Sequence, residues 1–211
     1  MTANVKSKKG VNEWHYLGDL TTLDNLHSTL AFPMSRYHDP ALKKVEEEIF
    51  DHYVRWMEFN DNRFVTNPEE GAEFYDGPNV LYYDLMGLIP RGKFEDHFYH
   101  IGPYFAKSTI GYRNMEVIAT TPEWGFVNMD QHYYGTSSDG HEFDFKFRMT
   151  GILRKTNGRW KWIQEHVSFP ANIADQKADF TLSSDAGEHL RMRNEDNEKR
   201  NEETGNFKKA H

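Results

Sequence analysis

Hydrophobic residues between positions 40 and 59 recur every three or four residues, the spacing of one face of an α-helix. Asp39-Pro40 stands directly before this stretch, and an acidic N-cap followed by proline is a common helix start. The spacing predicts a helix over residues 40–59 with one face turned toward the protein core. The apolar stripe of that face consists of Leu42, Val45, Ile49, Tyr53 and Trp56.

The pattern changes along the rest of the chain. A short strand is predicted over residues 80–85, and a second helix over residues 94–105, which Gly102-Pro103 interrupts. From about residue 108, hydrophobic residues alternate with polar ones, as they do in β-strands. Helices followed by a run of consecutive strands are typical of the α+β class with an antiparallel sheet. The predicted strands cover residues 109–121, 124–137, 141–155 and 159–169.

Two dipeptides predict how these strands pair. Asp139-Gly140 and Asn157-Gly158 are typical of two-residue hairpin loops, in which both central residues need a positive φ. A two-residue loop at the first turn places His132 opposite Phe147, and opposed residues point to the same side of a sheet. Pairing the residues outward from a two-residue loop at each turn predicts which side chains share a face. One face of the sheet then carries Asp130, His132, Tyr134, Phe147, Met149, Trp162 and His166.

This predicted face combines aromatic side chains with three titratable groups. A histidine beside a carboxylate can transfer protons near neutral pH, and an apolar wall with a few titratable groups is typical of small-molecule sites. Asp130, His132 and His166 are therefore candidates for acid–base catalysis. The same residues could instead form a buried polar network without a chemical role. On the opposite face, we expect Arg148 and Glu165 to form a cross-strand ion pair at a subunit interface.

Composition and charge narrow the range of functions. The chain of 211 residues has no cysteine, which excludes thiolate nucleophiles, iron–sulfur clusters and cysteine zinc sites. Its 33 acidic and 25 basic residues give a net charge of −8, which argues against a nucleic-acid partner. Neither a membrane-spanning run nor a secretory signal is visible, so we expect a cytoplasmic protein without a membrane partner. Asp96, His97 and His100 form only a weak metal motif, and we expect neither a metal nor another cofactor.

The two ends of the chain are more polar than its middle. Residues 1–20 predict an N-terminal arm with a few aromatic side chains, and residues 21–184 predict the α+β domain. Residues 185–211 are rich in Asp, Glu, Lys and Arg, which predicts a disordered tail or a frayed helix.

Several segments resemble a known family. They are Tyr83-Asp84-Leu85, then Phe147-Arg148-Met149-Thr150, and the closing segment Trp160–Pro170, which contains the pattern H-x-S-x-P. Across about residues 40–182, the chain resembles the SnoaL-like, ketosteroid-isomerase-like members of the nuclear transport factor 2 superfamily. The resemblance implies a cone-shaped, curved antiparallel sheet wrapped around N-terminal helices, with homodimers or homotrimers as common assemblies. It also implies cofactor-free proton transfer and makes Asp84 a candidate base; alternatively, Asp84 ends its strand by accepting backbone N–H groups.

These observations lead to a first hypothesis of a cofactor-independent lyase that acts on a small aromatic or phenolic substrate. His132 would be the base, Asp130 its orienting partner and His166 the acid, because two imidazoles allow an acid and a base to act together. A ketosteroid-isomerase-like isomerase, a polyketide cyclase and a non-catalytic small-molecule-binding or assembly module are the alternatives. The side chains expected to contact the substrate, or else only to fill the core, are Tyr53, Trp56, Tyr82, Tyr134, Phe147, Met149 and Trp162.

Overall fold

A computed structural model describes residues 9–20, 22–87, 89, 95–172 and 176–182. The chain divides into two compact units, residues 1–169 and residues 170–211. In the second unit, β7 (Ala171–Asn172) and β8 (Lys177–Ala178) form a two-stranded antiparallel sheet. The predicted polar tail over residues 185–211 lies outside the described residues, as do the first eight residues of the predicted arm.

The helices of the first unit include both that the sequence predicted. After one 3-10 turn, η1 (Pro40–Leu42), the long helix α2 covers Lys43–Arg63, and α4 (Glu95–Ile101) gives way at Gly102-Pro103 to the 3-10 turn η2 (Gly102–Phe105). Two further helices, α1 (Leu23–His27) and α3 (Pro68–Ala72), were not predicted, because five residues are too few for a helical repeat to be recognised.

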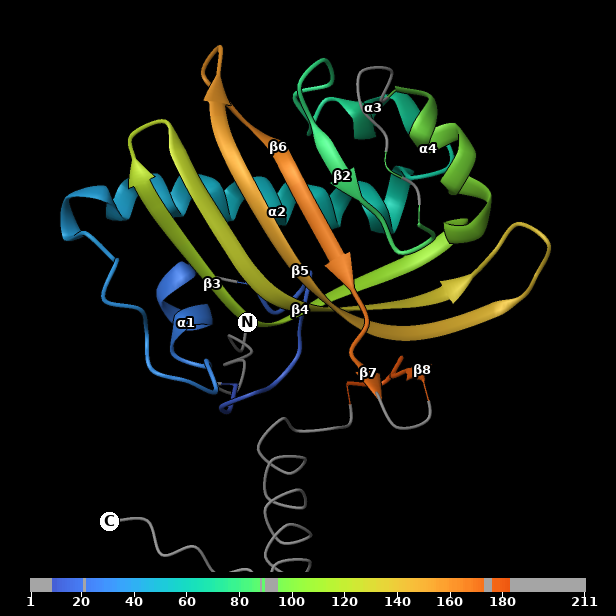
Figure 1. Cartoon of the computed structure of the whole chain (residues 1–211), viewed down its shortest axis with the longest axis horizontal. Helices are drawn as coiled ribbons and strands as arrows, with labels where there is room; N and C mark the ends of the chain where they lie inside the picture. The colour runs from blue at the N-terminus through green and yellow to red at the C-terminus, as the bar shows by residue number, and fades with distance from the viewer. Residues whose placement is uncertain (1–8, 21, 88, 90–94, 173–175, 183–211) are drawn as a thin grey trace, which may run out of the picture. The chain divides into compact units, whose positions relative to one another are not determined.

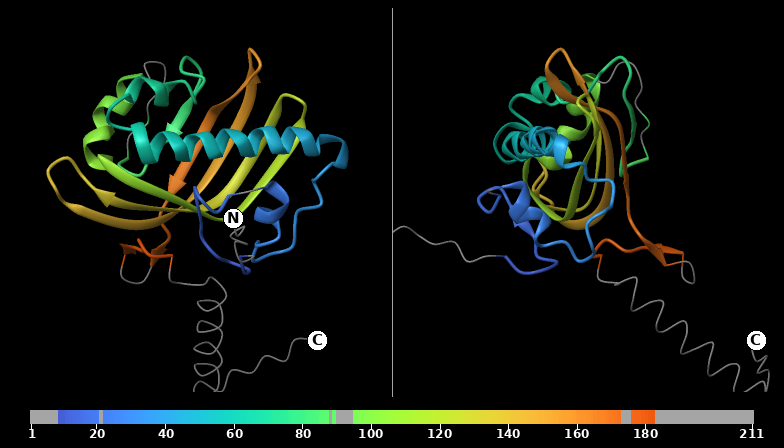
Figure 2. Two further views of the ribbon diagram at one scale, coloured as in Figure 1. Left: turned by 180° about the vertical axis from the view of Figure 1, so that it is seen from behind. Right: turned by 90° about the vertical axis from the view of Figure 1, so that its left-hand side faces the viewer.

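A six-stranded sheet forms the other layer of the first unit, and its strands follow the order β1-β3-β4-β5-β6-β2. β3 to β6 form the predicted antiparallel meander, whereas β2 joins the edge parallel to β6. Figures 1 and 2 show that the sheet curves around α2, which lies along its concave face. This confirms the predicted α+β fold with a curved sheet. The strands are β1 (His15–Tyr16), β2 (Leu81–Tyr83), β3 (Lys107–Thr121), β4 (Trp124–Thr136), β5 (Glu142–Thr156) and β6 (Arg159–Ser168).

The core lies between α2 and the concave face of the sheet. Tyr53 and Trp162 are fully buried there, and the indole N–H of Trp162 donates a hydrogen bond to the Tyr53 hydroxyl at 2.9 Å. Gly151 lies directly against this pair, since a Cβ at this position would be 2.6 Å from the Tyr53 hydroxyl oxygen. The absence of a side chain at Gly151 therefore allows the helix and sheet to approach closely.

The turn between β5 and β6 has the predicted form, with Asn157 and Gly158 both at positive φ and Leu153 opposite Trp162. Beyond Trp162, however, the register shifts by one residue, because Ile163 is an extra residue in β6. A shift of one residue exchanges the two faces of a strand. The prediction for the end of β6 is therefore wrong: Glu165 points to the concave face and His166 to the convex face.

The turn between β4 and β5 differs from the prediction. Its loop has three residues, 138–140, of which Gly140 has a positive φ, and the Ser137 hydroxyl accepts a hydrogen bond from the backbone N–H of His141. His132 consequently lies opposite Lys146 rather than Phe147. The predicted register of β4 is wrong: its concave face carries Gln131 and Tyr133 instead of Asp130, His132 and Tyr134.

Candidate active site

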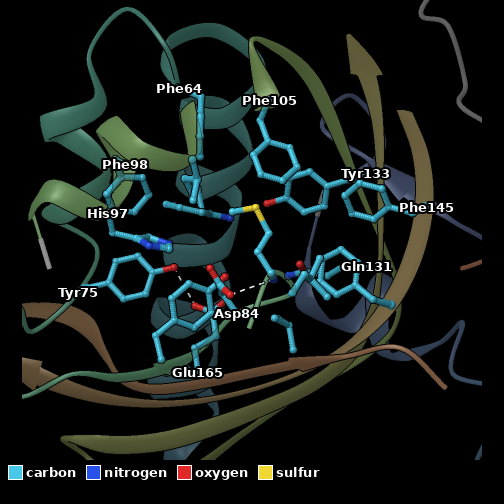
Figure 3. Close-up of a pocket in the computed structure, with 17 residues that line it drawn as sticks. Phe64, Tyr75, Asp84, His97, Phe98, Phe105, Gln131, Tyr133, Phe145 and Glu165 are labelled. Atoms are coloured by element: carbon cyan, nitrogen blue, oxygen red, sulfur yellow. Dashed lines mark hydrogen bonds between the residues drawn. The ribbon is translucent and has the colours of Figure 1, made fainter. Parts of the chain in front are cut away.

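A pocket opens on the concave side of the sheet, between the C-terminal end of α2, α4, β2 and the strands β4 to β6 (Figure 3). Its cavity has a volume of about 50 Å³ available to the centres of water molecules, which is room for a few water molecules. Aromatic side chains form most of its wall. Its lining consists of Trp56, Phe64, Tyr75, Tyr82, Asp84, Leu85, Met86, His97, Phe98, Ile101, Phe105, Gln131, Tyr133, Phe145, Phe147, Glu165 and Val167.

Glu165 is the most unusual group in this pocket, because it is a carboxyl group that is only 5% exposed. Its Oε2 accepts a hydrogen bond from the Tyr75 hydroxyl at 2.8 Å, and no lysine or arginine among the described residues pairs with it. Burial raises the pKa of Glu165 to about 8, and the negative charge of Asp84 adds to the increase. The side chain is therefore protonated at neutral pH and can donate a hydrogen bond.

Asp84 provides a second carboxyl group at the end of β2. Its Oδ1 accepts a hydrogen bond from the backbone N–H of Met86 at 2.9 Å, so the strand-ending role expected as the alternative is present. Asp84 also lines the pocket and remains partly exposed to water. Figure 3 shows the oxygen atoms of Tyr75, Asp84 and Glu165 close together on one side of the cavity.

Neutral side chains surround this pair of carboxyl groups. Burial raises the pKa of Tyr75 and of Tyr82 well above the usual value for tyrosine, so both hydroxyl groups stay protonated. The ring of His97 lies 5.2 Å from that of Tyr82, and burial lowers the pKa of His97 to about 4. The imidazole is therefore neutral at neutral pH, and the described side chains that line the pocket offer hydrogen-bond donors without a positive charge.

The residues predicted to contact a substrate fall into three groups. Trp56, Tyr82 and Phe147 line the pocket together with Asp84. Tyr53, Met149 and Trp162 are buried in the core but do not line it. Tyr134 lies on the convex face, where it is 39% exposed, because β4 has the other register.

The predicted catalytic group of Asp130, His132 and His166 also lies on the convex face, so its predicted place in the pocket is wrong. The register of β4 moves the first two residues there, and the extra Ile163 moves the third. One hydrogen bond joins Nδ1 of His132 to the Tyr16 hydroxyl (2.8 Å), and another joins Nε2 to the carboxyl group of Asp144 (2.9 Å).

Other predicted contacts on the convex face also change. Asp130 pairs with Arg113 at 2.9 Å and accepts a hydrogen bond from Asn114. The predicted ion pair between Arg148 and Glu165 does not exist, because Glu165 is on the concave face. These convex-face contacts join the N-terminal segment around Tyr16 to the sheet.

The sequence prediction missed Glu165, Tyr75 and Gln131 as pocket residues. One signal for Glu165 is visible in β6, where the large apolar residues change phase between Trp162 and Val167. A change of phase within one strand is what an extra residue produces. Tyr75 follows a helix too short to recognise, and its contact with Glu165 depends on the tertiary fold.

Within the described residues, no group of three or more His, Asp or Glu side chains is arranged to hold a metal ion. Among the same residues, the helices are too short or too polar to span a lipid bilayer.

Comparison with known proteins identifies the fold and one similar domain. Residues 97–172 match a family model described as a SnoaL-like domain. An NTF2-like protein of unknown function from Pseudomonas putida has a similar structure, with a TM-score of 0.54 and 20% identity over 67% of this chain and 97% of that one. A nuclear transport factor 2 (NTF2-like) superfamily protein from Salmonella enterica serovar Typhimurium has a TM-score of 0.53 and 22% identity over 62% and 94% of the two chains.

A third similar structure comes from Novosphingobium aromaticivorans and bears the name "Putative Scytalone Dehydratase". Its TM-score is 0.55, with 12% identity over 70% of this chain and 99% of that one. No curated protein is similar enough in sequence to count as a match. The matched domain and the shared fold agree with the resemblance seen in the sequence: residues 97–172 are similar to a SnoaL-like domain, and the chain has the fold of these NTF2-like proteins.

Proposed function

We propose that the protein is a cofactor-independent enzyme that removes a proton from a carbon atom next to a carbonyl group of a small aromatic substrate. The observation that carries this proposal is the neutral carboxyl group of Glu165 in the same apolar pocket as Asp84. Two carboxyl groups in different environments can act as acid and base at the same pH.

Asp84 is the base in this proposal. It is partly exposed and accepts a hydrogen bond from a backbone N–H, and such a donor stabilises a carboxylate. The carboxylate takes the proton from carbon, and the electron pair of the broken C–H bond moves toward the substrate oxygen. Glu165, held by Tyr75, donates a hydrogen bond from its protonated oxygen to the negative charge that develops there.

This step is common to an isomerase and a lyase. Return of the proton to a different carbon gives an isomer, whereas loss of a leaving group from the adjacent carbon gives elimination. The first hypothesis favoured a lyase because two imidazoles were expected in the pocket, and His132 and His166 do not lie there. The carboxyl pair supports the proton transfer that precedes either outcome. The assembly as a homodimer or homotrimer and the cytoplasmic location remain predictions.

The test uses hydrogen–deuterium exchange, which needs no knowledge of the natural substrate. Wild-type protein in deuterium oxide should accelerate the exchange of the benzylic protons of para-hydroxyphenylacetone, as followed by proton NMR. Asp84→Asn should lower the exchange rate by about 100-fold or more, because it removes the base. The asparagine oxygen can still accept the Met86 N–H, so the local structure should persist.

Asp130→Asn is the matched control, since it makes the same chemical change on the convex face, and it should exchange at the wild-type rate. A wild-type rate equal to that of buffer, or an unchanged rate in Asp84→Asn, would contradict the proposal. In the first case, the non-catalytic binding module would be the better description.

A further inference from the structure

Gln131 lies on the concave face of β4 and lines the pocket, although its side chain takes no part in the proposed proton transfer. The residue is only 3% exposed. Its neighbours on the same face are Met129, two residues earlier in β4, and Met149, which lies opposite Met129 in β5. The amide group of Gln131 therefore sits between two thioether side chains and the cavity.

The two methionines determine which way this amide points. Nε2 of Gln131 lies 3.1 Å from the sulfur of Met149 and 3.5 Å from the sulfur of Met129. A thioether sulfur can accept a hydrogen bond but has no hydrogen to donate. The amide nitrogen consequently faces the sulfurs, and the amide oxygen Oε1 is directed away from them.

Oε1 of Gln131 accepts no hydrogen bond from the described residues. Two hydroxyl groups of the pocket differ from it, because they have partners within the protein: Tyr75 donates to Glu165, and the Tyr133 hydroxyl donates to Asn60 at 3.4 Å. Gln131 lines the cavity, so Oε1 is an acceptor that a bound molecule can satisfy in place of water, and a ligand that covers it without a donor loses that hydrogen bond.

We propose that Gln131 is a specificity-determining residue, whose Oε1 accepts a hydrogen bond from a neutral hydroxyl or N–H group on the far end of the substrate. Figure 3 shows Gln131 across the cavity from Tyr75. This inference rests on the proposed function, in which the reacting oxygen lies at the Glu165 end. The substrate class is then a single aromatic ring with its reacting group at one end and a donor, such as a phenol O–H, at the other.

The same geometry argues against two other kinds of substituent at that end. A methoxy group has no hydrogen to donate, and it would leave Oε1 unpaired and without access to water. A phenolate or carboxylate would place negative charge against a carbonyl oxygen, and none of the described residues that line the pocket is a lysine or arginine. The site should therefore select a neutral donor over both an ether and an anion.

The test compares the binding of two ligands that differ only at this end, para-hydroxyphenylacetone and para-methoxyphenylacetone. Isothermal titration calorimetry should show that wild-type protein prefers the hydroxyl compound by about tenfold or more. Gln131→Leu keeps the approximate volume of the side chain but removes the acceptor, so it should bind both compounds equally. Thermal unfolding of this variant establishes that it is folded.

Two further variants separate the possible outcomes. Asp84→Asn should keep the wild-type preference, since binding at Gln131 does not require the base. The binding preference can therefore be observed even if the proposed catalysis fails. Met149→Leu retains the amide but removes its nearer sulfur acceptor, and it should reduce the preference to an intermediate value. A full preference in Gln131→Leu would mean that size alone selects the ligand and would overturn the inference. Failure of wild-type protein to bind the hydroxyl compound at millimolar concentration would overturn it as well.

Discussion

The two faces of the sheet carry similar polar residues in different electrostatic settings. On the convex face, Asp130 pairs with Arg113, and His132 contacts Asp144 at 2.9 Å. On the concave face, the carboxyl group of Glu165 accepts a hydrogen bond from the neutral hydroxyl of Tyr75 and forms no ion pair with any described residue. Burial without a counter-charge raises the pKa of Glu165 to about 8, whereas burial of a paired charge is compensated by its partner.

This difference shows which polar cluster is a candidate for chemistry. Counting histidines and carboxylates favours the convex face, where two of the three predicted catalytic residues are joined to charged partners. Those contacts give Asp130 and His132 a structural role. His132 connects the sheet to Tyr16, and Arg113, the partner of Asp130, stacks on Trp14 of the N-terminal segment. Glu165 on the concave face has no charged partner among the described residues. A pocket residue with a strongly shifted pKa is typical of a functional site.

The largest expected effect is on the pH dependence of stability in Glu165→Gln. The folded state raises the pKa of Glu165 from its ordinary 4.5 to about 8, so the unfolded chain loses this proton first as the pH rises. Wild-type stability should therefore fall between these two pH values, by roughly 3 kcal/mol between pH 4.5 and 7. Glutamine keeps a neutral side chain of the same shape, and the variant should not show this loss.

Urea unfolding at several pH values measures the difference between Glu165→Gln and wild type. Other titrating groups, such as the buried His52 and His97, are present in both proteins and cancel in this difference. A difference that stays constant from pH 4.5 to 7 would mean that Glu165 is ionised in the folded protein, and the contrast between the two faces would disappear.

A smaller effect is expected from His132→Ala on the convex face. The substitution removes the contacts with Tyr16 and Asp144 and should lower the free energy of unfolding by about 1–2 kcal/mol. The deuterium-exchange rate of the folded variant should be that of wild type, because the imidazole does not reach the pocket. A large loss of exchange in a stably folded His132→Ala would restore the catalytic role that the sequence first indicated.

The smallest effect is expected from His166→Ala. His166 is exposed on the convex face, where its ring lies 5.6 Å from that of Tyr83. Its removal should change the free energy of unfolding by no more than about 0.5 kcal/mol and leave exchange unchanged. Thermal unfolding and the exchange assay together check this, and an inactive variant would argue that His166, not Glu165, faces the substrate.

The sequence predicted the order and type of the main elements because each depends on many residues. The apolar stripe of α2 and its start at Asp39-Pro40 are examples, and so is the β5–β6 turn, where both Asn157 and Gly158 have positive φ. Trp56, Tyr82, Asp84 and Phe147 line the pocket, because the errors in register exchanged the faces of β4 and of the end of β6 and left those of α2, β2 and β5 unchanged.

Which side chains of β4 and of the end of β6 point to the concave side could not be predicted in this way, because in each strand this depends on a single residue. At the first turn, the side chain of Ser137 binds the backbone of His141 and supports a three-residue loop in place of a two-residue loop. In β6, one extra residue, Ile163, reverses the alternation. Such local changes leave the average pattern of a strand intact while exchanging its faces.

The extra residue in β6 also has a consequence for how this fold could diversify. Glu165 and His166 are neighbours with different acid–base properties, and the two-residue period of a strand allows only one of them to face inward. A chain that lacked the insertion at Ile163 would turn the imidazole inward and the carboxyl group outward, with every other amino acid unchanged. The length of one strand thus acts as a selector between two chemistries already encoded side by side.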